Sequence, residues 1–150
     1  ERPEMNVMGL NAVMGITVGK FMTAVALNDH VVATRSRTIH NARVAFKKFR
    51  YTLETVLPLL PQITKEKLKA MDAYQTRMGN IQDNEVLRVL VRRFAQRRTL
   101  ASRRKLSAFQ RELLLRKREL VADYIRSADE IYDFWTPATL SHERPLNTTI

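Results

Sequence analysis

Apolar residues recur at helical spacing along most of the chain, and the clearest case lies between residues 39 and 57. At roughly 100° per residue, the apolar side chains of this stretch fall in one arc roughly 120° wide. An arc of that width suits a helix that faces the core of a bundle. The pattern therefore predicts a central helix over residues 39–57, with a buried face made of Ala42, Ala45, Phe46, Phe49, Leu53, Val56 and Leu57.

The same spacing predicts four further helices, over residues 10–35, 64–78, 83–98 and 99–135. A polar triplet at residues 28–30 marks a kink or break in the first of them. Gly79 is expected to end one helix as a left-handed C-terminal cap, and Asp83 is expected to begin the next as its N-cap. That next helix should bury Val86, Leu87, Leu90, Val91 and Phe94.

These elements predict an all-α fold, an antiparallel bundle of about four to five helices. The bundle is expected over residues 10–135, after a lead-in at residues 1–9. Residues 136–150 are polar and rich in Thr and Pro, which predicts a flexible tail.

A second arc of the central helix is polar and mostly basic. It is roughly 100° wide on the same arithmetic. Like charges three or four residues apart repel by a few tenths of a kcal/mol per pair, and an anion lying along the row would remove that cost. The alternative is a solvated basic face in which Glu54 pairs with Arg50. The members of this arc are His40, Arg43, Lys47, Arg50, Tyr51 and Glu54.

The charge of the chain points to anionic partners. Its 150 residues include 26 Lys and Arg against 15 Asp and Glu, a net charge of +11. Such a balance favours polyphosphate, nucleic acid or an acidic membrane surface. No cysteine is present, which excludes disulfides and thiolate metal sites. No run of eighteen apolar residues and no signal-peptide layout occurs, so neither a membrane span nor secretion is expected.

A second basic row lies in the last predicted helix. Between residues 97 and 118 the only acid is Glu112, and Arg104, Arg111 and Arg118 repeat every seven residues along one side. Either this row is a solvated face or it forms the opposite wall of a basic cleft with the central helix.

Two ordered motifs resemble the signatures of the CHAD domain family. The first comprises His40, Arg43-Val44, the pair Lys47-Lys48, Arg50-Tyr51 and Glu54; the second comprises Gln75, Met78-Gly79 and Asp83, with Met78 where the family commonly has Leu. The resemblance implies an all-helical module that binds inorganic polyphosphate through basic side chains, without a demonstrated catalytic role. It also implies a cytoplasmic location linked to polyphosphate granules.

The resemblance assigns polyphosphate binding to His40, Arg43, Lys47, Lys48, Arg50 and Tyr51. Residues three or four apart on a helix lie roughly 5 to 6 Å from each other, so this row can follow successive phosphates. Glu54 is expected to orient Arg50 or Lys47, and Gln75 either contacts the ligand or is a satisfied core amide. Family members usually have two facing repeats, whereas one signature set occurs here. Either the chain is half of a longer protein, or two copies pair as a homodimer.

Chemistry for catalysis is absent from the sequence. Neither His30 nor His142 has a plausible metal-ligand spacing to His40, so no metal site is expected, and no cofactor is implied. A phosphohydrolase would need acidic metal ligands, and an enzyme is therefore not expected. Two other classes stay open, a nucleic-acid binder and a helical scaffold for an acidic partner. Aromatic residues make up only 7% of the chain and do not interleave with the basic row, which disfavours nucleic acid.

Overall fold

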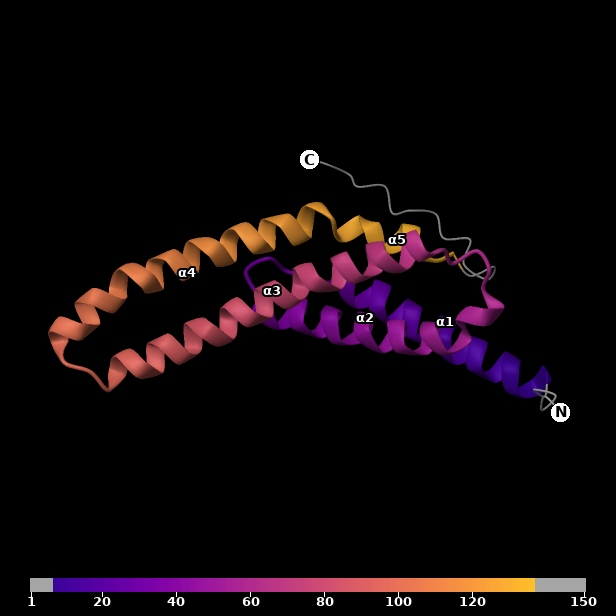
Figure 1. The fold of residues 1–150 in the computed structure, drawn as a ribbon, viewed down its shortest axis with the longest axis horizontal. Helices are drawn as coiled ribbons and strands as arrows, with labels where there is room; N and C mark the ends of the chain where they lie inside the picture. Colours follow the sequence, from indigo (N-terminus) through magenta and orange to yellow (C-terminus); the bar gives the residue numbers. More distant parts are fainter. Residues whose placement is uncertain (1–6, 137–150) are drawn as a thin grey trace.

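The computed structural model describes residues 7–136, which form five α-helices and two 3₁₀ turns (Figure 1). This confirms the predicted all-α bundle. Residues 1–6 of the expected lead-in and residues 137–150 of the expected tail lie outside the described residues. In order, the elements are α1 (Val7–Asp29), α2 (Ser36–Val56), η1 (Leu57–Leu59), α3 (Lys65–Gln96), α4 (Leu100–Arg126), η2 (Ala128–Glu130) and α5 (Ile131–Phe134).

The helices form two hairpins of unequal length. α1 and α2 pack against each other, α3 packs on α2, and α4 folds back along α3. The end of α3 and the start of α4 project beyond α1 and α2 (Figure 1). We call residues 85–117 the arm, because an ion pair between Lys117 and Glu85 joins α4 to α3 at its base. Among the described residues, each helix of the arm has only the other helix as a neighbour (Figure 1).

Aromatic side chains fill the core between α1, α2 and the end of the described chain. The predicted apolar face of α2 is buried from Ala42 to Val56, as expected from its spacing. The ring of Phe49 has its centroid 4.9 Å from that of Phe21 in α1 and stacks on Trp135 at 5.9 Å. These contacts fix the buried face of α2, and they leave its polar flank at the surface.

The predicted break between residues 78 and 83 is wrong, because α3 continues through it. Thr64 caps the start of the helix, since its hydroxyl accepts a hydrogen bond from the backbone N–H of Lys67. Gly79 has no positive φ, and Asp83 lies in the helix interior. Packing outweighs both local signals: the buried stripe runs without interruption through Met71, Tyr74, Met78 and Ile81. A break would also leave backbone groups without partners.

The predicted inward face of the arm is also wrong. Four of its five apolar side chains are exposed, and Val91 is half-buried: the exposed ones are Val86, Leu87, Leu90 and Phe94. The physical reason is the number of neighbours. Only α4 covers this part of α3, so one stripe is buried and the apolar residues of the other stripe stay uncovered.

The break in the first helix has a structural use. α1 ends at Asp29 instead of continuing to residue 35, and Asn28 is buried in its last turn. The hydroxyls of Tyr74 and Tyr124 each donate to Asn28 Oδ1 at 2.6 Å. Asn28 Nδ2 donates to the carbonyl of Ala128 at 3.2 Å. One side chain therefore joins α1 to α3, α4 and η2.

Burial keeps these two tyrosines protonated. It raises the pKa of Tyr74 far above its ordinary value, and the neighbouring Tyr124 raises it further. Burial also raises the pKa of Tyr124. Both hydroxyls thus stay available as donors to Asn28.

By length and composition, the segment Gly9–Asp29 of α1 could cross a membrane, although it contains no unbroken run of eighteen apolar residues. One such helix is weak evidence, because the core helix of a soluble protein or a signal sequence meets the same criterion. The expectation of no membrane span therefore stays a prediction.

Candidate anion-binding site

The polar flank of α2 lies against three successive turns of α3. His40 Nδ1 is 3.0 Å from Gln82 Oε1 near the start of α2. One turn on, Arg43 lies over Gly79. Near the other end, Arg50 bonds to Gln75. The two helices thus run antiparallel, and both signature motifs meet along one seam.

Arg43 has an unsatisfied donor in this seam. Its side chain is half-buried, and its Nε is buried with no hydrogen-bond partner among the described residues. Such groups are uncommon in folded proteins, and an acceptor on a bound ligand would satisfy this one. No carboxylate of the described residues pairs with Arg43, Lys47 or His40. We call these three residues the basic row.

The Arg43 side chain lies over Gly79 of α3. A Cβ at this position would be 3.7 Å from Arg43 Nε and 4.0 Å from a terminal nitrogen, which are ordinary contact distances. The glycine therefore has room for a methyl group, and its backbone is helical. Gly79 therefore does not turn the chain.

Gly79→Ala should therefore stabilise the protein. Alanine in a helix interior is favoured over glycine by roughly 1 kcal/mol, which raises the melting temperature of a protein of this size by a few degrees. Thermal unfolding followed by circular dichroism measures the shift. A loss of stability would contradict a helical backbone at Gly79, because alanine destabilises a protein at a position with a left-handed backbone.

Arg50 differs from the basic row because its charge is already compensated. Its side chain is only 15% exposed, and it pairs with Asp72 at 3.0 Å and with Glu54 at 3.4 Å. Gln75 Oε1 accepts a further bond from it at 3.3 Å. Two carboxylates face one guanidinium, so this end of α2 carries no excess positive charge. Arg50 joins α2 to α3 and marks the end of the basic row.

The two lysines of the basic pair lie on different flanks of α2. Lys47 Nζ is 5.4 Å from the ring centroid of the exposed Tyr51, beside the basic row. Lys48 instead lines a groove of about 340 Å³ between α1 and α2, together with Lys20, His40 and Asn41. His40 thus belongs to the basic row and also lines the groove between α1 and α2. Lys20 was not among the predicted site residues, because the pattern of α2 holds no information about which face of α1 lies beside it.

The second basic row does not face α2. Leu113, Leu120 and Tyr124 are the buried face of α4 and pack toward α3. At helical spacing, the three arginines of the second basic row lie on the opposite side of α4 from these buried residues, and all three are exposed. They are Arg104, Arg111 and Arg118. The structure therefore does not bring this row opposite the basic row. Arg111 instead borders a groove between α3 and α4.

Within residues 7–136, no group of three or more His, Cys, Asp or Glu side chains is placed to hold a metal ion. Two carboxylates at one end of α2, those of Glu54 and Asp72, are both bonded to Arg50. The arrangement offers cationic donors and no set of metal ligands.

Taken together, the helical hairpins and the basic seam define an all-α module with a cationic helix flank. A sequence model of the CHAD domain matches residues 15–92, more than half of the chain. The chain therefore belongs to the CHAD domain family. The match covers most of α1, all of α2 and most of α3, and so includes the whole seam. Neither the curated proteins nor the solved structures gave a match to this chain.

Proposed function

We propose that this CHAD domain binds inorganic polyphosphate along the basic row of α2, and that it does so without catalysing a reaction. The observation that carries the proposal is the unpartnered Nε of Arg43, held over Gly79 between two further basic residues. The association of the family with polyphosphate binding supports the same ligand.

The chemistry of the row suits a linear chain of phosphates. Arg43 can grip two oxygens of one phosphate with its fork of donors, whereas Lys47 supplies a point charge. His40 adds a contact that strengthens when its ring is protonated. Turns of a helix bring such residues roughly 5 to 6 Å apart, which lets a flexible chain contact them in succession.

A binding role, as opposed to hydrolysis, is supported by what surrounds the row. Metal-assisted phosphate hydrolysis needs carboxylates that hold a divalent ion beside the substrate. Here Glu54 and Asp72 are engaged by Arg50, at the end of the row. The ion pair of Arg50 with Asp72 joins α2 to α3. The basic row has no carboxylate partner among the described residues and can bind an anion.

Nucleic acid is the alternative ligand, and competition distinguishes the two. Labelled long-chain polyphosphate bound to the protein is challenged with unlabelled polyphosphate or with duplex DNA at matched phosphate concentration. We expect DNA to require about ten times more phosphate than polyphosphate for half displacement, because a rigid duplex meets fewer residues of one helix flank. Equal displacement by the two competitors would contradict the proposal.

Pairing of two copies and association with polyphosphate granules stay predictions. The exposed apolar side chains on α3 of the arm are the surface that a second copy would cover. These are Val86, Leu87, Leu90 and Phe94.

A further inference from the structure

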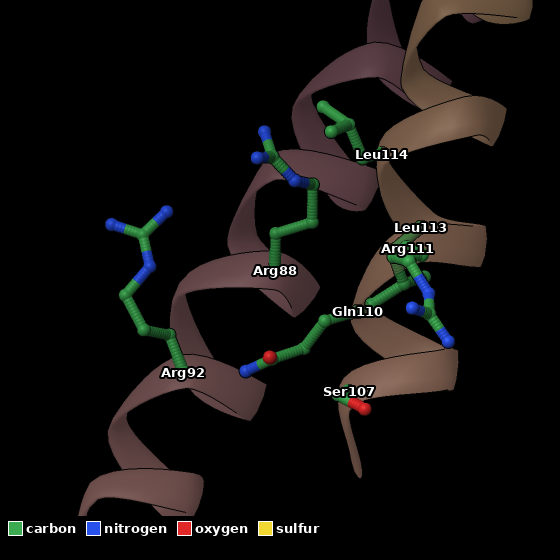
Figure 2. A pocket seen from close by; sticks show the side chains of 7 residues that line it. All are labelled: Arg88, Arg92, Ser107, Gln110, Arg111, Leu113 and Leu114. Atoms are coloured by element: carbon green, nitrogen blue, oxygen red, sulfur yellow. The ribbon is translucent and has the colours of Figure 1, made fainter. Parts of the chain in front are cut away.

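A groove in the arm lies apart from the basic row. It has a volume of about 380 Å³ and is lined from both α3 and α4 (Figure 2). Sites for small molecules in proteins occupy roughly 300 to 1,000 Å³, so the groove can hold a compact ligand. Its lining residues are Arg88, Arg92, Ser107, Gln110, Arg111, Leu113 and Leu114.

The polar side of the groove is cationic. Arg88 and Arg92 lie one turn apart on α3, and the Gln110 side chain reaches from α4 toward them (Figure 2). No acidic residue lines the groove. The side chains of Arg92 and Gln110 have no hydrogen-bond or ion-pair partner within residues 7–136. Arg111 points away from α3 in this view, so the binding argument rests on the other three side chains.

Arg88 is held in place at the edge of the groove. Its guanidinium donates to Glu85 Oε2 at 2.9 Å, and Lys117 contacts the same oxygen at 2.9 Å. Burial alone would raise the pKa of Glu85, but Lys117 and Arg88 outweigh it and hold that pKa below its usual range. One carboxylate is therefore shared by two cations, and an excess of positive charge remains beside the groove.

The other side of the groove is apolar. Leu113 is buried against α3, and Leu114 is 36% exposed at the surface of the groove. Inorganic polyphosphate has no apolar part that could cover Leu114. A ligand that fits both sides carries a phosphate at one end and an apolar group at the other.

We propose that this groove binds phosphate esters of apolar groups, independently of the basic row. Arg92, Arg88 and the Gln110 amide hold the phosphate oxygens, because guanidinium groups and amide N–H donors match them in geometry. The apolar group packs on Leu114 and on the exposed edge of Leu113. The site thus differs from the basic row both in place and in the chemistry of its ligand.

Titration of phenyl phosphate into the whole chain tests the proposal, with Arg92→Ala and Arg93→Ala as a matched pair. Both arginines lie on α3 of the arm and are exposed, but only Arg92 lines the groove. We expect Arg92→Ala to weaken phenyl phosphate binding about tenfold, and Arg93→Ala to change it by less than about twofold. Equal weakening by the two variants would overturn the proposal, because it would indicate attraction by net charge alone.

A second variant tests the apolar side. Wild-type protein should bind phenyl phosphate more tightly than inorganic phosphate, and Leu114→Ser should remove that preference. Equal binding of phenyl phosphate and inorganic phosphate by the wild type would overturn the proposal. Binding to vesicles that contain phosphatidic acid is measured in parallel. Binding to vesicles alone, if it is lost in Arg92→Ala, assigns the phosphate to a lipid headgroup. Binding of phenyl phosphate assigns it to a small ester. The Arg43→Glu/Lys47→Glu variant should retain phenyl phosphate binding, so this test is separate from that of polyphosphate.

Discussion

Replacement of Asn28 by leucine should destabilise the protein by roughly 3 kcal/mol, because it leaves several buried polar groups without their partner. Asn28 Oδ1 accepts from Tyr74 and Tyr124, and its Nδ2 donates to Ala128. Leucine has a similar size, so the loss reflects the hydrogen bonds more than a cavity. Thermal unfolding should show a fall in melting temperature of roughly 10 °C.

The control is Asn80→Leu, at an exposed position of α3, which should change stability by less than about 0.5 kcal/mol. A rescue variant sharpens the test. Tyr74→Phe and Tyr124→Phe added to Asn28→Leu should recover part of the loss, because removing both partners of a buried hydrogen bond costs less than removing one. The account of Asn28 is wrong if Asn28→Leu is as stable as Asn80→Leu.

The all-α class and the buried face of α2 could be predicted from the sequence because both depend on the angle between successive residues of one helix. No knowledge of the neighbours was needed to place Phe46, Phe49 and Leu53 on one side.

Gly79 and Asp83 were misread because their local preferences compete with packing. A glycine costs roughly 1 kcal/mol in a helix, which is less than the burial of a continuous stripe provides. Met78 and Ile81 are both buried, one on each side of Gly79, and their spacing of three continues the helical period. That regular spacing was the signal in the sequence for one long α3.

The number of neighbours around a helix cannot be read from its own pattern. Leu90 and Phe94 have the spacing of core residues, yet they are exposed because the arm has only two helices. For the same reason the pattern of α2 alone did not reveal the ion pair that Arg50 makes with α3. Its carboxylate partner Asp72 lies on another helix, and only the register between α2 and α3 brings the two together.

Reversal of two charges in the basic row should remove most of the affinity for polyphosphate. In Arg43→Glu/Lys47→Glu, two attractive contacts become repulsive, and each charge-assisted contact contributes roughly 1.5 kcal/mol or more. The expected loss is therefore about 100-fold or greater. Arg43→Gln/Lys47→Gln removes the charges without reversing them and should give a smaller loss, which keeps the test valid if the glutamates disturb the seam. Circular dichroism establishes that both variants are folded.

The most direct test of the α2 site is calorimetric titration of long-chain polyphosphate into the wild type, into Arg43→Glu/Lys47→Glu and into Arg93→Glu/Lys105→Glu. The last variant has the same change in net charge, at two exposed positions of the arm outside the groove. Binding that weakens about 100-fold only when the basic row is reversed would establish that row as the site. Equal losses in the two variants would contradict it, because polyphosphate would then respond to the total charge of the protein and to no particular surface.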